Sequence, residues 1–172
     1  MTVDFPNKHF LINGEWVCSN TEIDLINPST GDVIAQVSEA NNEHVNDAVG
    51  VAKDTLENTW KNITARERST LLSTLGRLIE ENYDVLASLE ATDVGKPLRQ
   101  AQADVKALAR YMEFYAGAAD KLHGDTIPYL EDYTVYTLRE PHGVCAHIIP
   151  WNYPMQITVS YTHLTLPTTN SG

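Results

Sequence analysis

The side chains best suited to chemistry lie close together near the carboxyl-terminal end of the chain. An apolar run at residues 144–149 is followed by the stiff, aromatic segment Pro150-Trp151-Asn152-Tyr153-Pro154. Asn152 carries a neutral amide, which can donate a hydrogen bond to a developing oxyanion at any working pH. The residues before it could form an apolar wall against a flat ring or a sugar. An asparagine before an aromatic-proline pair is also a common turn former, and periodicity alone favours that interpretation of Asn152.

The run at residues 144–149 predicts a strand buried on both faces of a parallel sheet. In doubly wound α/β sheets, ligands bind just past the carboxyl ends of the strands, which is where Asn152 would lie. Cys145 and His147 would share one face of such a strand. A thiol inside a buried apolar run is unreactive, so we interpret this pair as structural.

The segments upstream predict a small antiparallel β unit followed by four helices. Strands are expected on both sides of Asn13-Gly14, a tight-turn dipeptide, and at residues 22–26 and 33–37. The first helix begins after Asn41 or Asn42, and the second begins at Thr64, which forms a capping box with Glu67. The third helix ends at Gly95 and the fourth starts at Pro97. The apolar stripes of these helices predict core, and the acidic residues predict solvated faces. The first two stripes are Val45, Ala48, Val49, Ala52 and Leu56, then Leu71, Leu72, Leu75, Leu78 and Ile79.

Composition narrows the class of protein. The chain has 172 residues, of which 42% are hydrophobic, and a formal charge of −11. This acidic balance argues against nucleic acid or an anionic membrane as a partner, because phosphate binding needs clustered lysine and arginine. Only two cysteines are present and the first residues contain no signal-peptide run, so a cytoplasmic protein is expected. The six histidines show no metal-ligand spacing.

Several stretches resemble motifs of the aldehyde dehydrogenase superfamily, in the family's order. The segment at residues 143–154 is similar to its I-x-P-W-N and N-x-P pattern, and the resemblance covers about residues 8–157. The other similar stretches are Ile12-Asn13-Gly14-Glu15-Trp16, Asn27-Pro28-Ser29-Thr30-Gly31, Arg66-Glu67-Arg68, Asp93-Val94-Gly95-Lys96-Pro97 and residues 111–128.

The resemblance implies a partial aldehyde dehydrogenase fold of the α/β class. Its parts would be an N-terminal β unit, four helices, an oligomerisation-arm hairpin and the first strand of the cofactor-binding sheet. Residues 1–124 and 142–157 would belong to the NAD(P)-binding domain and residues 125–141 to the arm, with a strand at 129–138. Residues 158–172, rich in Thr and Ser, do not look native to the family, and the catalytic domain is expected to be absent.

The resemblance also implies roles for particular residues. Asn152 would donate its amide to the oxyanion of the tetrahedral intermediate. The nicotinamide cofactor, NAD or NADP with NAD favoured, would contact Ile148, Ile149, Pro150 and Trp151. Tyr153 and Met155 would lie near the aldehyde substrate. Asp93 would help to hold a monovalent cation, together with the backbone carbonyl of Leu25, although a carboxylate near a helix end is more often solvated.

In the resembled family a thiolate attacks the aldehyde, hydride passes to NAD(P)+, and a glutamate-activated water releases the acid. That cysteine and that glutamate are expected outside this chain, so the chain itself is expected to be inactive. The parent would be a homo-oligomer, either a dimer or a tetramer. Two alternatives stay open: a non-catalytic binding or assembly module of the same fold, and a relative that reduces acyl phosphates or thioesters.

Overall fold

The computed structural model describes residues 9–160, and its amino-terminal part consists of two β hairpins. Strand β1 (Phe10–Ile12) pairs antiparallel with β2 (Glu15–Val17), and β3 (Glu22–Ile26) pairs antiparallel with β4 (Val33–Ser38). Asn13 and Gly14 between β1 and β2 have φ angles of 54° and 77°, as a type I′ turn requires. The predicted antiparallel β unit is therefore confirmed, as two separate two-stranded sheets.

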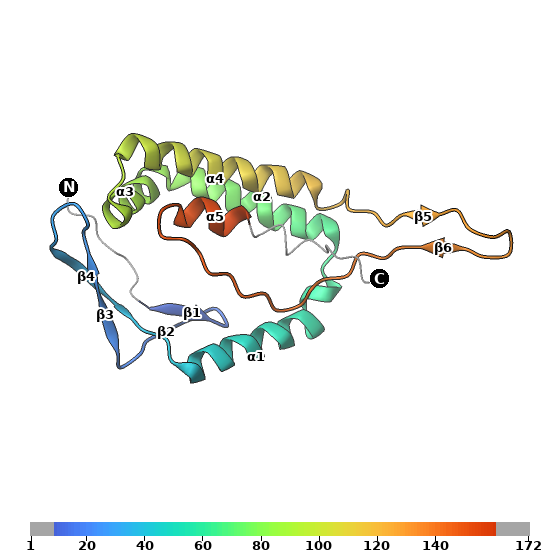
Figure 1. The fold of residues 1–172 in the computed structure, drawn as a ribbon, viewed down its shortest axis with the longest axis horizontal. Helices are drawn as coiled ribbons and strands as arrows, with labels where there is room; N and C mark the ends of the chain where they lie inside the picture. Colours follow the sequence, from blue (N-terminus) through green and yellow to red (C-terminus); the bar gives the residue numbers. More distant parts are fainter. Residues whose placement is uncertain (1–8, 161–172) are drawn as a thin grey trace.

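Five α-helices and one short 3-10 helix follow the hairpins (Figure 1). They are α1 (Asn42–Asn58), η1 (Trp60–Asn62), α2 (Ala65–Glu81), α3 (Tyr83–Val94), α4 (Leu98–Ala118) and α5 (Pro154–Ser160). Local chemistry sets their ends. Asn41 caps α1, Thr64 and Glu67 form the predicted capping box of α2, and α3 ends at Gly95 in the left-handed conformation.

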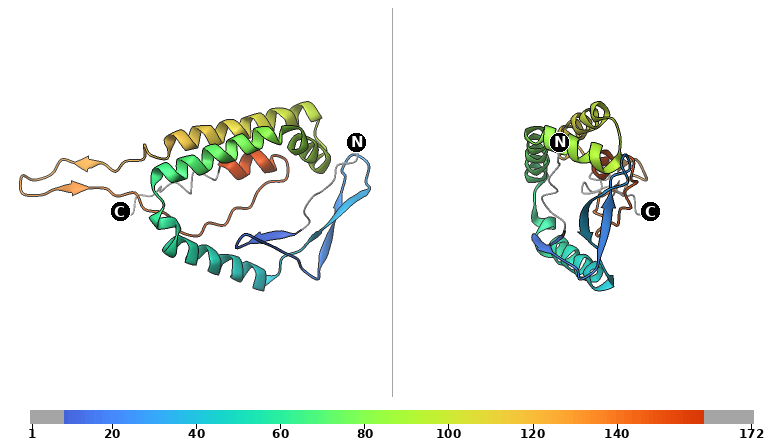
Figure 2. Two further views of the ribbon diagram at one scale, coloured as in Figure 1. Left: turned by 180° about the vertical axis from the view of Figure 1, so that it is seen from behind. Right: turned by 90° about the vertical axis from the view of Figure 1, so that its left-hand side faces the viewer.

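The core lies where α2, α3 and α5 pack against α4 (Figure 2). Buried residues of α4 include Val105, Leu108 and Met112, and they meet Leu72 and Ile79 of α2. A Cβ atom added at Gly76 of α2 would lie 3.2 Å from the Met112 Cβ, so glycine lets these two helices approach closely. This four-helix unit supports the candidate site.

Two predicted core stripes are only partly buried. No residue of α1 is buried, and Leu71, Leu75 and Leu78 of α2 are exposed. The expectation that these stripes form core is wrong for α1 and for this outer face of α2. Within residues 9–160, α1 makes its main contacts with η1 and β1 rather than with another long helix.

The predicted strands after α4 also differ from the structure. Residues 144–149 form no strand and all but Ile149 are exposed, so the prediction of a buried strand is wrong. Within the described part of the chain no strand lies beside them, and a lone strand would leave its N–H and C=O groups unpaired. In the projecting hairpin, only β5 (Thr126–Ile127) and β6 (Val135–Tyr136) pair, which is shorter than the strand predicted at 129–138 (Figure 1).

The end of the described chain is helical. Helix α5 includes Thr158 and Ser160, so the change of character predicted at residue 158 does not end regular structure there. Residues 161–172, the rest of the predicted tail, lie outside the described residues. Among residues 9–160, none of the helices has the length and apolar character that crossing a membrane demands.

Candidate functional site

The loop from Pro150 to Tyr153 lies between an irregular, exposed segment and helix α5. Because α5 packs on α4, this loop is brought to the amino-terminal end of α4. The apolar residues before Asn152 face solvent: the exposed fraction is 94% for Ile148 and 79% for Trp151. Asn152 is also exposed. The loop thus presents an exposed apolar surface beside an exposed amide.

Tyr153 points the other way, towards α4. Its hydroxyl oxygen accepts a hydrogen bond from Nε2 of Gln100 at 2.8 Å. The Lys96 ammonium lies 4.4 Å from the centre of its ring. Met155, the second residue of α5, is half-buried against the core of α2–α4. The loop that carries Asn152 is thus exposed at its tip and anchored at its base.

Beneath Tyr153 lies a buried cluster of three charged residues. The Lys96 ammonium donates hydrogen bonds to Oε1 of Glu90 and, at 2.8 Å, to Oδ2 of Asp104. The side chains of Lys96, Glu90 and Asp104 are exposed by 7%, 0% and 9%. The other carboxylate oxygen of Glu90 is buried and has no hydrogen-bond partner. The cluster therefore holds one cation between two carboxyl groups.

Burial and pairing shift the titration of this cluster. Burial raises the pKa of Glu90, and hydrogen bonding to Lys96 offsets only part of that effect. Burial alone would lower the pKa of Lys96, but the hydrogen bonds to Asp104 and Glu90 outweigh it and raise the pKa. Lys96 is accordingly charged at neutral pH.

Sequence reasoning missed this cluster. It treated Lys96 only as part of a helix stop and the acidic residues as solvated faces, which is wrong for Glu90 and Asp104. The available signal was the placement of three charges around Gly95-Lys96-Pro97 on otherwise apolar helix faces. The three charged side chains come together because the tight turn at Gly95 folds the end of α3 back onto the start of α4.

The two residues predicted to hold a monovalent cation, Asp93 and Leu25, lie on neighbouring elements. A Cβ atom at Gly95, two residues after Asp93, would lie 2.6 Å from Cγ of Pro28 in the β3–β4 turn. Burial of the Asp93 carboxyl group raises its pKa, although the residue as a whole is exposed. Within residues 9–160 no three His, Cys, Asp or Glu side chains gather as metal ligands. A cation here would need further backbone oxygen donors, and the site stays a prediction.

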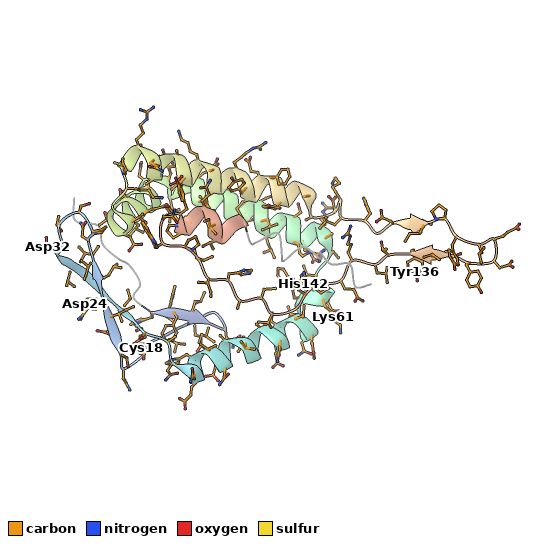
Figure 3. The ribbon with its side chains drawn as sticks, viewed as in Figure 1. Cys18, Asp24, Asp32, Lys61, Tyr136 and His142 are labelled. Carbon is orange, nitrogen blue, oxygen red and sulfur yellow. The ribbon has the colours of Figure 1, made fainter. Side chains whose placement is uncertain are left out.

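Both cysteines are free, and neither belongs to a nucleophilic site in the described residues. Cys145 is exposed, not buried as expected, and its thiol lies 3.6 Å from the Gly143 carbonyl oxygen. Cys18 follows β2 at the opposite end of the molecule from Tyr136 on the projecting hairpin (Figure 3).

Comparison with known proteins identifies the wider group. A model of the aldehyde dehydrogenase family matches residues 16–171. The mitochondrial aldehyde dehydrogenase family 2 member B4 of Arabidopsis thaliana is 42% identical over 158 residues, which cover 90% of this chain and 29% of that protein. The chain thus spans about a third of the length of the relatives it matches.

Solved structures agree with the sequence match. An aldehyde dehydrogenase from Bacillus cereus, in complex with NAD+, superposes with a TM-score of 0.89 and 38% identity, over 94% of this chain and 34% of that one. An NADP-dependent enzyme from E. coli superposes with a TM-score of 0.88 and 32% identity, with the same coverage of both chains. A partial α/β fold of this kind was the expectation from sequence, and it is confirmed although the predicted sheet strand is not formed. The motifs, the family match and the shared backbone agree, and the chain belongs to the aldehyde dehydrogenase family.

Proposed function

We propose that the chain is the amino-terminal part of an enzyme that oxidises an aldehyde to a carboxylic acid with NAD(P)+. Family membership supports the reaction class. The neighbours include three structures in complex with NAD and one enzyme described as NADP-dependent, so the cofactor class is supported. Our preference for NAD over NADP and the identity of the aldehyde remain predictions.

The exposed Asn152 loop is the observation that carries this proposal. In it, the Asn152 amide donates a hydrogen bond to the substrate oxygen as negative charge develops there. Because the amide is neutral, this donation does not depend on pH, and one such donor contributes about 2.7–4 kcal/mol to the transition state. Ile148, Ile149, Pro150 and Trp151 form the apolar wall that excludes water from one side of the reaction. These residues would hold the nicotinamide cofactor, which would supply a hydride acceptor.

Other residues complete the proposal. Tyr153 and Met155, at the base of the loop, lie near the aldehyde substrate in this proposal, and Asp93 with the Leu25 carbonyl supports a monovalent cation. The hairpin within residues 125–141 serves as an arm between copies in a homo-oligomer. Its exposed Tyr129, Leu130, Tyr133 and Tyr136 support this role, since such apolar surface is typical of a contact region. A cytoplasmic location stays a prediction, and the Arabidopsis relative is described as mitochondrial.

The test uses the gene for this chain, expressed with its downstream coding sequence, and measures aldehyde-dependent NADH formation. Asn152→Ala should lower kcat about 10²- to 10³-fold with little change in KM, because the amide acts on charge that develops only in the transition state. Asn20→Ala, at another exposed asparagine, is the matched control and should leave kcat unchanged. An unaltered kcat in Asn152→Ala would show that the Asn152 amide does not stabilise the oxyanion.

The purified 172-residue chain should form no NADH with any aldehyde, since the thiolate and the glutamate base are expected outside it. Turnover by the purified chain would overturn that part of the proposal.

A further inference from the structure

Tyr153 is fixed at three points of its structure, and two of them lie at the amino-terminal end of α4. Its ring lies below the Lys96 ammonium, its hydroxyl accepts from Gln100, and its carbonyl oxygen accepts from the amide of Ile157 at 3.0 Å. We propose that Lys96, buried between Glu90 and Asp104, is a positioning residue that holds Tyr153 and thereby sets the place of the Asn152 amide. The importance of that placement for catalysis depends on the proposed function.

The ion pairs hold the Lys96 ammonium in a fixed orientation beside the Tyr153 ring. An ammonium group has three donors, and two of those on Lys96 are engaged by Glu90 and Asp104. A solvated lysine would sample many rotamers, whereas this one is locked by two ion pairs in a buried site. Since few water molecules compete for it, its attraction to the face of Tyr153 is stronger than at an exposed site.

One carboxylate would be enough to neutralise Lys96, but two carboxylates contact it. A single ion pair would leave the ammonium free to rotate about the pair, while a second carboxylate fixes its direction. The cost is visible in the buried, unpartnered oxygen of Glu90. A cluster retained at this cost is poorly explained by stability alone, because apolar residues of similar volume often replace buried ion pairs without loss.

The backbone couples the position of the Tyr153 ring to the position of Asn152. Asn152 directly precedes Tyr153, and Pro150 and Pro154 restrict the φ angles on either side of the pair. The loop therefore has few ways to move its tip while its base is held. Loss of the hold on Tyr153 should free both the loop and the first turn of α5.

The first test measures amide hydrogen exchange in the 172-residue chain by NMR. In Tyr153→Leu, which leaves the charged cluster intact, the Ile157 amide should exchange about three- to thirtyfold faster than in the wild type. The Met112 amide in the α2–α4 core should not change. Tyr153→Phe retains the ring and should show a smaller increase. Unchanged exchange of Ile157 in a folded Tyr153→Leu chain would overturn the proposal.

The second test separates the cation from the burial of the cluster. Lys96→Met alone leaves two buried carboxylates without a cation and can fail to fold. The triple variant E90Q/K96M/D104N removes all three charges at similar volume, and its Ile157 amide should also exchange faster. A triple variant with wild-type exchange at Ile157 would contradict the role of the cation.

A spectroscopic signature tests the contact between Lys96 and Tyr153 directly. The Lys96 ammonium nitrogen lies over the face of the Tyr153 ring, so the adjacent ε-methylene protons should resonate upfield in the wild type and in Tyr153→Phe, but not in Tyr153→Leu. Absence of the upfield shift in the wild type would count against the contact. Because neither measurement needs turnover, failure of the positioning role is distinct from failure of Asn152→Ala to lower kcat.

Discussion

The α2–α4 unit and the segment that leads to Asn152 are both rich in apolar residues, but only the first of them buries these residues. Met112 in α4 is fully buried, whereas Ile148 is 94% exposed. Helices satisfy their backbone hydrogen bonds internally and need only a face to pack on. A strand needs a neighbour along its length, and the segment at 144–149 has none among the described residues. Apolar character alone therefore does not decide burial; the availability of a partner does.

The largest expected effect comes from a cavity in the better-packed region. Met112→Ala should lower the free energy of unfolding by about 2–5 kcal/mol, because the surrounding helices collapse only partly around the lost side chain. Ile148→Ala removes a similar apolar volume from an exposed position and should change it by less than about 0.5 kcal/mol. Urea unfolding monitored by circular dichroism measures both. Equal losses would mean that the 144–149 segment is packed after all.

The next effect tests the turn that brings the charged cluster together. Gly95→Ala should cost about 1–3 kcal/mol, because Gly95 has a φ angle of 74° and an added Cβ would lie 2.6 Å from Cγ of Pro28. Gly117→Ala is the matched control, since nothing lies within 4 Å of its added Cβ. In helix α4 that change should raise stability by up to about 1 kcal/mol. Thermal unfolding of the two variants would show opposite shifts.

A smaller effect concerns the capping box of α2. Thr64→Ala should lower the free energy of unfolding by about 0.5–2 kcal/mol at pH 7, while Thr70→Ala within the same helix should not lower it. Hydrogen bonds from Thr64 lower the pKa of Glu67 below its ordinary value of 4.5. Their stabilisation is thus present above pH 4.5 and is lost as the pH falls through the lowered value.

The wild type and Glu67→Gln should consequently differ at pH 7 and converge towards pH 3. A difference that grows on acidification would contradict this assignment of the pKa shift.

The smallest effect on stability is expected at the projecting hairpin. Tyr136→Ala should leave the free energy of unfolding within about 0.5 kcal/mol of the wild type, since the side chain is exposed. If the hairpin pairs copies as proposed, sedimentation of the expressed full-length gene product should show weaker association. Full association in this variant would count against the arm.

The local elements could be predicted from sequence because their signals are local. The Asn13-Gly14 turn, the Thr64 and Glu67 box and the Gly95 stop each act within a few residues, and the structure confirms them. The Trp151-Asn152 motif carried the family resemblance, and the comparison with known proteins confirms that family. Its chemical role depends on groups far away in sequence and remains proposed.

Burial, by contrast, was decided only by the tertiary structure. The same apolar spacing is buried on one face of α2 and exposed on α1, and Glu90 and Asp104 are buried although acidic residues are usually solvated. Sequence determines which face of an element is apolar, through the 3.6-residue period. Which face is covered, and which charges meet beneath Tyr153, depends on contacts between residues distant in the chain. The free energy of those contacts is not encoded in any single segment.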